Sequence, residues 1–512
     1  MLRTLKQVFG YDSFRPNQRE IIDSIISCRD VFAVMPTGGG KSLCFQMPAK
    51  LMQGTVVVIS PLISLMKDQV DSAVASGLAA AYINSSLKGR EAFETYRQMR
   101  GGQLELLYIA PERFAMPAFV ETLKGISICL FAIDEAHCIS EWGHDFRPDY
   151  LNLSAIVTHF PNVPIAAFTA TATAKVQSDI IERLGLREPF VIRASFDRPN
   201  LFYQIRKKVD VETHIVDFIN QRPSEAGIIY RASRNSVDTL TSSLIASGIR
   251  ALPYHAGLPP EVRKRNQELF IRDETDVIVA TIAFGMGIDK SNVRFVIHAD
   301  LPKNIEAYYQ ETGRCGRDGA PATCILFYGR QDIMKLRYFI NKIEDDNERA
   351  IAVEKMNQVI RYASNEFCRR RQLLGYFGER YPHNNCGTCD VCTDDVNTFQ
   401  GVIEQSPPAL RPAAKPPRPA PASSRPVSSP ATVTGQGQTL FERLRVLRKR
   451  IADEQQLPPY VIFHDITLNE MCKYLPTNSE EFLSLTGVGQ RKLQRYGSVF
   501  INEIRAYLAK QR

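Results

Sequence analysis

Long apolar runs are absent from this 512-residue chain, and its opening residues lack the apolar core and cleavage site of a signal peptide. Without a run of about 18 apolar residues, a membrane span is not expected. An excess of charge of one sign is missing too, since the net charge is only +8. This mild basicity permits a polyanionic partner without establishing one. We therefore expect a cytoplasmic protein with no membrane partner.

Two series of short apolar, β-branched runs alternate with helix-like segments along the first 335 residues. Strands that are apolar almost throughout are typical of parallel sheets covered by helices on both faces. The pattern predicts an α/β fold with two consecutive domains, residues 1–200 and 201–335. The expected strands are residues 31–34, 55–59, 104–109, 128–133, 165–168, 227–230, 277–280, 295–297 and 324–327.

Residues 336–512 lack the alternation of strands and helices that marks the first 335. The whole chain is longer than one hydrophobic core usually serves, so further domains are expected in this part. Helical patterning dominates residues 336–396. A linker is expected at residues 397–436, where nine prolines fall between Pro407 and Pro430. Such a segment should be extended and unable to bury a core. Helical periodicity then returns, and residues 437–512 are expected to form a small all-α domain.

A glycine-rich turn joins the first predicted strand to a helical segment, and it reads Pro36, Thr37, Gly38, Gly39, Gly40, Lys41, Ser42. Glycines allow backbone N–H groups to close around phosphate oxygens, and a helix N-terminus favours the anion. Lys41 is then expected to reach the β- and γ-phosphates of ATP, and Ser42 to ligate Mg²⁺. Met35 stands where the strict pattern has glycine. The alternative is a glycine-rich turn without a ligand.

An acidic pair, Asp134 and Glu135, closes a second buried strand and is followed by His137. A carboxylate at a strand end near the phosphate loop is placed to hold hydrated Mg²⁺, which we expect of Asp134. Glu135 would orient and deprotonate the attacking water. Taken alone, such a pair would be a solvated strand end.

Arg314 and Arg317 follow Gln310 in the second α/β domain, among glycines. Two arginines three residues apart on one helical turn share a face. Pointed across a cleft between the domains, they would stabilise charge on the γ-phosphate, an effect worth about 10³–10⁵ in rate. The alternative is a basic surface turn.

These elements, in this order, resemble superfamily 2 helicases, and specifically the RecQ family, over nearly the whole chain outside the linker. The resemblance implies two tandem RecA-like domains, a helical zinc-binding module and a small all-α HRDC domain. It adds His137 and Gln310 to the catalytic set. It also implies adenine recognition near the amino terminus, where Tyr11 would stack on the base, Arg15 would support it and Gln18 would pair with adenine N6 and N7.

Residues 140–150 resemble the aromatic-rich loop that couples DNA binding to hydrolysis in the family. Trp142, the chain's only tryptophan, and Phe146 would stack on bases, while Arg147 would hold a phosphate or stack. Aromatic residues usually belong to a core. The His, Asp, Arg and Gly around these two favour an exposed loop instead.

Four of the eleven cysteines gather near residue 380: Cys368, Cys386, Cys389 and Cys392. In a reducing cytosol such clustering favours a metal over disulfides. Four thiolates suit tetrahedral Zn²⁺, and the set matches the RecQ zinc-binding region, so zinc is expected to support folding. The neighbouring Arg369, Arg370 and Arg371 are expected either to contact DNA phosphates or to form a solvated helix face.

The carboxy-terminal residues 457–463, 485–489 and 492–493 resemble the HRDC domain. Gly487-Val488-Gly489 would form a turn whose amides approach a phosphate backbone, with Arg491, Lys492 and Arg495 nearby. Many RecQ proteins carry a winged-helix domain between the zinc module and the HRDC domain. Only some 45 residues intervene here, so we expect that domain to be missing.

The leading hypothesis is an ATP-dependent DNA helicase of RecQ type that moves 3′→5′ on single-stranded DNA. Using ATP, Mg²⁺ and Zn²⁺, it would unwind tailed or forked duplexes in DNA repair, recombination and replication, near the nucleoid if the source is bacterial. A single-strand-binding protein or recombination proteins are candidate partners. The alternatives are a translocase or strand-annealing factor with weak unwinding, an RNA helicase, and a non-catalytic zinc-dependent DNA-binding scaffold.

Overall fold

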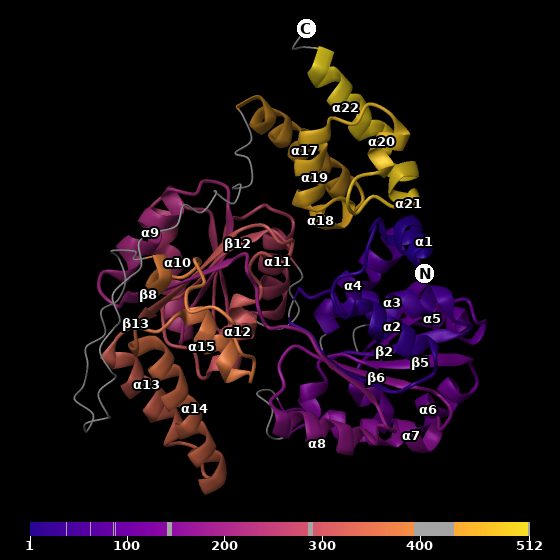
Figure 1. Ribbon diagram of the computed structural model, residues 1–512, viewed down its shortest axis with the longest axis horizontal. Helices are drawn as coiled ribbons and strands as arrows, with labels where there is room; N and C mark the ends of the chain where they lie inside the picture. The colour runs from indigo at the N-terminus through magenta and orange to yellow at the C-terminus, as the bar shows by residue number, and fades with distance from the viewer. Residues whose placement is uncertain are drawn as a thin grey trace.

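A computed structural model of the chain describes residues 1–509 apart from 37, 62, 85–86, 88, 141–145, 285–289 and 394–434. The side chains of residues 63–65 and 435–439 also lie outside this description. Two α/β domains lie side by side, and a carboxy-terminal helical module lies against both of them at one end (Figure 1). Within the described residues, no helix is both long and apolar enough to span a membrane.

The first domain is built on a seven-stranded parallel sheet in the order β3-β4-β2-β5-β6-β1-β7. Its central strands are buried on both faces, which agrees with their almost wholly apolar sequences. The strands are β1 (Val31–Val34), β2 (Thr55–Ile59), β3 (Ala80–Ile83), β4 (Leu106–Ile109), β5 (Ile128–Ile133), β6 (Ile165–Thr169) and β7 (Phe190–Arg193).

Helices cover both faces of this sheet, as right-handed parallel connections require (Figure 1). The α-helices are α1 (Leu2–Thr4), α2 (Gln18–Ile26), α3 (Lys41–Leu51), α4 (Ile63–Ser76), α5 (Gly89–Arg100), α6 (Pro117–Lys124), α7 (Ala155–His159) and α8 (Ala174–Leu184). The π- and 3₁₀-helical turns are η1 (Leu5–Phe9), η2 (Pro111–Ala115), η3 (Ala136–Ile139) and η4 (Pro148–Ser154).

The second domain carries a six-stranded parallel sheet in the order β10-β11-β9-β12-β13-β8. Its strands are β8 (Leu201–Lys207), β9 (Ala226–Tyr230), β10 (Ala251–Tyr254), β11 (Val277–Ala280), β12 (Val293–His298) and β13 (Ala322–Tyr328). Its helices are α9 (Val211–Asn220), α10 (Arg234–Ala246), α11 (Pro260–Ile271), η5 (Ile282–Phe284) and α12 (Ile305–Thr312). The two sheets agree with the predicted pair of α/β domains.

A helical region follows directly from β13 and packs on the segment between the two α/β domains. It consists of α13 (Arg330–Ile340), α14 (Asp346–Ser364), α15 (Arg369–Tyr376) and α16 (Asp390–Thr393). The ring of Phe377 stacks on Phe196 with centroids 4.5 Å apart. The carboxylate of Glu379 accepts hydrogen bonds from Ser195 Oγ at 2.5 Å and from the backbone N–H of Phe196 at 2.7 Å. These contacts fasten the region to the interdomain segment.

The carboxy-terminal module has a hydrophobic core of its own, in which Phe463 meets Phe482, Tyr496 and Phe500 edge to face. Such ring pairs add to the stabilisation from buried area. The module consists of α17 (Gly435–Glu454), α18 (Pro459–Ile462), α19 (Asp465–Tyr474), α20 (Ser479–Leu483), α21 (Gln490–Lys492), η6 (Leu493–Gly497) and α22 (Ser498–Ala509).

Candidate functional site: a cavity shared by three domains

The glycine-rich turn leads from β1 into α3, as predicted. Gly38 and Gly40 have φ angles of 80° and 83°, a left-handed conformation that glycine adopts without steric cost. Gly40 is the N-cap of α3, so Lys41 and Ser42 occupy the first helical turn, where N–H groups and helix dipole favour an anion. Thr37 lies outside the described residues.

The acidic run at the end of β5 faces this loop. The ammonium of Lys41 lies 3.9 Å from Oε1 of Glu135. Glu135 itself adopts a left-handed backbone conformation with φ of 48°, and its Oε2 is buried without a hydrogen-bond donor. Nδ1 of the buried His137 lies 3.3 Å from that oxygen and 3.0 Å from Thr169 Oγ1. The carbonyl of Asp134 accepts a hydrogen bond from the Tyr150 hydroxyl at 2.9 Å, which fixes the strand end.

The residues assigned to adenine recognition lie at the other edge of the loop. The amide of Gln18 donates to the carbonyl of Gly40 at 3.0 Å and accepts from the N–H of Arg15 at 2.8 Å. The guanidinium of Arg15 donates to the carbonyl of Gly38. Tyr11 lines the same cavity. Arg15 and Gln18, two of the three predicted base-binding residues, are therefore hydrogen-bonded to the phosphate loop.

The arginine pair approaches this loop from the second domain. A methyl group placed on Gly38 would lie 3.5 Å from Cγ of Arg317. Arg314 is buried, and its Nε has no hydrogen-bond acceptor. The expectation that both arginines lie on a helical turn is wrong, because α12 ends at Thr312 and turns containing Gly313 and the left-handed Gly316 follow.

Residues of the interdomain segment, where the first predicted domain ends, hold the arginine turns in place by hydrogen bonds. The guanidinium of Arg198 donates to the carbonyls of Cys315 and Gly316 at 3.0 and 2.8 Å. The side-chain amide of Asn200 donates to the carbonyl of Gly316 at 2.9 Å. Nothing in the local sequence pattern predicts these hydrogen bonds, because the residues that they join lie 116 to 118 positions apart.

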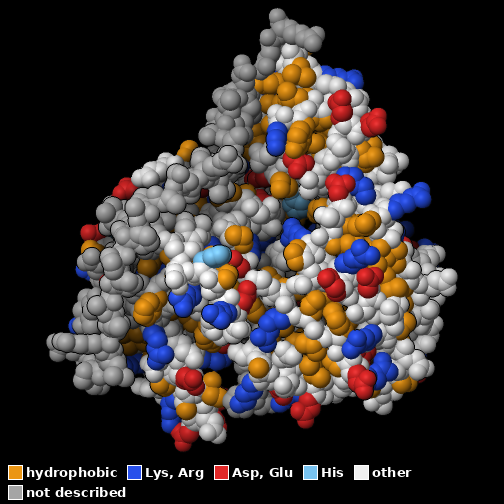
Figure 2. All heavy atoms as spheres, viewed as in Figure 1, with side chains coloured by type: hydrophobic (Ala, Val, Ile, Leu, Met, Phe, Trp, Pro, Cys, Tyr) orange, Lys and Arg blue, Asp and Glu red, His pale blue; other side chains and the backbone are white. Residues whose placement is uncertain are grey.

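These groups line one cavity of about 390 Å³ between the domains. The surface is hollowed at this place, between the two α/β domains and beneath the helical module (Figure 2). The lining includes almost every described residue predicted for catalysis or nucleotide binding: Tyr11, Arg15, Gln18, Gly38, Gly40, Lys41, Ser42, Asp134, Glu135, His137, Gln310, Arg314 and Arg317. It also includes residues of the carboxy-terminal module, among them His464 and Lys492, which were not predicted there.

The aromatic-rich loop is described only in part, because Trp142 lies outside the described residues. Phe146 is 37% exposed, which agrees with a surface position rather than a core one. Arg147 donates a hydrogen bond to the carbonyl of Pro61 at 3.1 Å. This contact joins the loop to the segment between β2 and α4.

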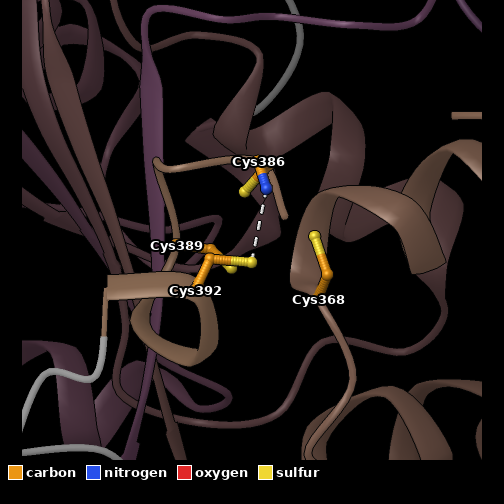
Figure 3. A group of neighbouring side chains, drawn as sticks. All are labelled: Cys368, Cys386, Cys389 and Cys392. Atoms are coloured by element: carbon orange, nitrogen blue, oxygen red, sulfur yellow. Dashed lines mark hydrogen bonds between the residues drawn. The ribbon is translucent and has the colours of Figure 1, made fainter. Parts of the chain in front are cut away.

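The four predicted zinc ligands converge, as Figure 3 shows. Their sulfur atoms all lie within 4.8 Å of one another, and a tetrahedral Zn²⁺ with bonds of about 2.3 Å needs sulfur atoms roughly 3.8 Å apart. Backbone N–H groups of Cys386 and Thr388 donate to the sulfurs of Cys392 and Cys386 at 3.4 Å. Such N–H···S contacts favour thiolates, so this donor set fits zinc.

Two of the three arginines beside Cys368, Arg369 and Arg370, do not serve as predicted, whereas Arg371 is exposed. Arg369 is buried and pairs with the buried Asp390 at 2.9 Å, while Arg370 is buried and pairs with Asp197. Neither a DNA contact nor a solvated face is available to these two side chains. The ion pair of Arg369 joins two parts of the zinc region, and the ion pair of Arg370 attaches that region to the interdomain segment. Arg371 donates to Asn384 at 3.4 Å.

The Gly487-Val488-Gly489 turn, predicted to approach a nucleic-acid backbone, lies against the amino-terminal turn η1 instead. The N–H of Gly487 donates to the carbonyl of Gly10 at 2.9 Å. A methyl group on Gly489 would lie 2.7 Å from the carbonyl oxygen of Val8. In this arrangement the turn has no room for a phosphate backbone.

Four family models match the chain. They are the DEAD/DEAH box helicase over residues 15–180, the helicase conserved C-terminal domain over 210–319, the RecQ zinc-binding region over 330–393 and the HRDC domain over 437–504. No winged-helix model matches. The interval between the last two models contains the proline-rich segment.

Solved structures share the fold of the two α/β domains. Helicase Lhr of Mycobacterium smegmatis, bound to single-stranded DNA and AMP-PNP, gives a TM-score of 0.52 over 68% of this chain and 49% of that chain, at 21% identity. Dbp5 of Saccharomyces cerevisiae, bound to RNA and ADP BeF3, gives 0.51 over 68% of this chain and 94% of that one, at 16% identity. At these identities the similarity concerns the fold alone.

Closer relatives span nearly the entire chain. The ATP-dependent DNA helicase RecQ of Bacillus subtilis is 39% identical over 98% of this chain and 98% of its own length, in an alignment of 579 positions. The RecQ protein of Haemophilus influenzae is 38% identical over 99% and 96%. An alignment longer than the 512 residues of this chain means that the relative has residues without a counterpart here. The chain belongs to the RecQ family.

Proposed function

We propose that this chain is a DNA-dependent ATPase that moves 3′→5′ on single-stranded DNA and unwinds duplexes with a single-stranded tail. One observation carries the ATPase part: a single cavity collects Lys41, the Asp134–Glu135 pair and Arg314 with Arg317 from two domains. The names of the relatives, which are ATP-dependent DNA helicases, support DNA as the substrate. The direction of movement is proposed from the family.

Each residue of the cavity has a separate role in ATP hydrolysis. Lys41 and the amides of the phosphate loop bind the β- and γ-phosphates, and Glu135 accepts a proton from the attacking water. Arg314 and Arg317 neutralise charge that develops on the γ-phosphoryl oxygens. Because these arginines come from the second domain, hydrolysis depends on how closely the two domains approach.

Magnesium fits the oxygen donors of this site. Ser42, in the first turn of α3, and Asp134, at the end of β5, would hold it beside the phosphates. When bound, the ion neutralises phosphate charge. Asp134 lines the cavity and would hold the hydrated ion.

The decisive experiment compares the wild type with Lys41→Ala. We expect ATP hydrolysis to be abolished in the variant while binding of a single-stranded oligonucleotide is retained, because Lys41 lies in the nucleotide cavity and not on the DNA loop. ATP hydrolysis that survives the substitution would refute the site. Lys50→Ala, at the far end of the same helix, is the matched control.

In a second candidate function the chain is the same DNA-dependent ATPase, but ATP hydrolysis does not lead to efficient duplex unwinding. Because no winged-helix model matches, we propose as the alternative a translocase or strand-annealing factor with weak unwinding. Unwinding of 3′-tailed, forked and four-way substrates, measured beside translocation on single strands, separates the two. Rapid translocation with negligible strand separation would favour the alternative. A single-strand-binding protein or recombination proteins added to these assays would reveal whether a partner restores unwinding.

A further inference from the structure

Two central strands of the second sheet bring aromatic side chains together at their carboxyl ends. Tyr230 is the last residue of β9 and His298 the last of β12, and the two are partners in the register of these neighbouring strands. Side chains at paired positions lie on the same face of a sheet, so their rings can meet. The rings stack with centroids 5.1 Å apart and planes 24° apart, and both side chains are buried. This stack fixes the direction in which the Tyr230 hydroxyl points.

The hydroxyl of Tyr230 connects an arginine of the nucleotide cavity to a backbone carbonyl. It donates a hydrogen bond to the carbonyl of Phe284, the last residue of η5, at 3.3 Å. It also accepts a hydrogen bond from the guanidinium of Arg314. A phenol hydroxyl both donates and accepts, so these two contacts set the direction of its proton. Arg198 and Asn200 hold the backbone of the arginine turns, whereas Tyr230 contacts the side chain of Arg314.

Tyr230 is a neutral group at physiological pH. Burial raises the pKa of its hydroxyl above the ordinary value of a tyrosine, and the nearby Arg314 offsets only part of that rise. A neutral hydroxyl holds a guanidinium without cancelling its charge, as a carboxylate would. The positive charge of Arg314 therefore stays available for phosphate oxygens in the nucleotide cavity, which Arg314 lines.

The carbonyl that accepts the Tyr230 hydroxyl is itself held in place. The ring of Phe284 is buried and packs on Tyr254 of β10, with centroids 4.6 Å apart, and edge to face on Phe270 of α11, at 5.9 Å. The N–H of Phe284 donates to the carbonyl of Thr281 at 3.0 Å. Because protein interiors are close-packed, a ring enclosed by two elements has little freedom to move. Phe284 is therefore a fixed anchor for the Tyr230 hydroxyl.

A second buried contact holds the end of the helix that precedes Arg314. Nε2 of His298 lies 2.7 Å from Oε2 of Glu311, and both side chains are buried. An ionised carboxylate can only accept, so the proton of this hydrogen bond is on Nε2. Glu311 lies in the last turn of α12, and its carbonyl accepts a hydrogen bond from the N–H of Arg314 at 3.3 Å. His298 therefore supports the Tyr230 ring by stacking and the arginine turn by this hydrogen bond.

We propose that Tyr230 is a positioning residue for Arg314 and that its hydroxyl directs the guanidinium toward the γ-phosphate. The carbonyl of Phe284 anchors this hydroxyl, and the hydrogen bond between His298 and Glu311 supports the ring and the turn. The proposal rests on the ATPase function proposed above and assigns a further residue to the same site. An arginine that is directed in advance needs no rearrangement in the transition state, so the hydroxyl contributes to the rate of hydrolysis and not to substrate binding.

The first test removes the hydroxyl alone in the full-length protein. Tyr230→Phe keeps the ring and its stack on His298. We expect the kcat of the DNA-stimulated reaction to fall about 10- to 100-fold, the loss expected for one hydrogen bond to a charged group, with the KM for ATP unchanged. Tyr254→Phe is the control and should leave kcat unchanged, because Tyr254 packs on the same Phe284 ring but its hydroxyl reaches Gln267.

A second test separates positioning from a structural role. ADP with aluminium fluoride resembles the transition state of phosphoryl transfer, whereas AMP-PNP resembles the substrate. Tyr230→Phe should weaken binding of the first about 10- to 100-fold and leave binding of the second unchanged. In an Arg314→Ala background Tyr230→Phe should lower kcat no further, because a hydroxyl that acts through the arginine has nothing left to direct. Glu311→Leu, which deprives His298 of its acceptor, should change the two affinities in the same way and provides the test if Tyr230→Phe does not fold.

Three results would overturn the proposal: an unchanged kcat in Tyr230→Phe, an equal weakening of the two nucleotide complexes in either variant, or an undiminished further loss of kcat in the double variant. The last two would mean that Tyr230 supports the fold of the second domain and not the direction of Arg314. Failure of the proposed function gives a different result. A wild type without ATP hydrolysis would refute the ATPase itself, whereas an active wild type that Tyr230→Phe matches would refute only the role of Tyr230.

Discussion

The ammonium of Lys41 lies 3.9 Å from Oε1 of Glu135, although β6 separates β1 and β5, the strands that lead to these two residues. The carboxyl ends of parallel strands meet at one edge of a sheet, so two residues 94 positions apart in the sequence become neighbours there. The second oxygen of Glu135 is buried and accepts no hydrogen bond. The carboxylate of Glu135 lines the nucleotide cavity, where, in the proposed function, it accepts a proton from the attacking water.

Glu135→Gln should therefore uncouple nucleotide binding from hydrolysis. The amide keeps the shape of the side chain but accepts no proton, so kcat should fall by about 10²–10⁴. Binding of AMP-PNP should be unchanged or stronger, because a negative charge is removed beside the γ-phosphate. Steady-state ATPase assays with saturating single-stranded DNA check the first expectation and titration calorimetry the second. Glu121→Gln, an exposed residue on α6, is the control, and a kcat within threefold of wild type in Glu135→Gln would exclude Glu135 as the base.

Arg317→Ala tests whether the second domain completes the site. Loss of an arginine that neutralises the γ-phosphate should lower kcat by about 10³–10⁵, equivalent to roughly 4–7 kcal/mol, with a small effect on nucleotide binding. Arg314→Ala should act in the same direction. Because Arg314 is buried, its variant must also be compared with wild type in thermal unfolding. Arg330→Ala, exposed at the start of α13, is the control. A kcat for Arg317→Ala near that of the control would favour the alternative interpretation, in which these arginines form a basic surface turn without a catalytic role.

The strands of both sheets were predictable where they are central and not where they are at an edge. Every run named from the sequence is a strand, whereas β3, β7, β8 and β10 were not named. These four are the edges of the two sheets. An edge strand is partly exposed and carries mixed residues, as the alternating burial of β7 illustrates, so its apolar signal is weak.

The site was predictable where its residues form local motifs. The phosphate loop, the acidic run and the four cysteines each carry their chemistry within a few residues, and the structure brings each of them together as predicted. Arg369 and Arg370 were not predictable, because their carboxylate partners lie 21 and 173 residues away. The same holds for Lys492, whose place in the cavity depends on how a whole module docks.

Cys389→Ser should remove zinc and soluble protein together. Cys389 is fully buried, and its neighbour Thr388 accepts a hydrogen bond from Tyr203 of β8 at 3.3 Å, so the metal loop also holds the edge of the second sheet. Structural zinc is worth about 10–16 kcal/mol in small modules, more than most domains have to spare. Atomic absorption and soluble yield are the measurements. Cys472→Ser, a cysteine of the carboxy-terminal module outside the cluster, is the control. Full zinc occupancy in Cys389→Ser would contradict the four-ligand site.

Trp142 provides an optical test of the DNA loop, because it is the only tryptophan of the chain. Phe146, four positions further along the chain, is exposed, and Arg147 joins this segment to the carbonyl of Pro61. We expect a base that stacks on this segment to change the surroundings of the indole ring. Saturating single-stranded DNA should quench or shift the emission, and Phe146→Ala should weaken DNA binding by about 1–3 kcal/mol. Phe93→Ala, an exposed phenylalanine on α5, is the control. Emission that stays unchanged while an independent assay records DNA binding would place the DNA elsewhere.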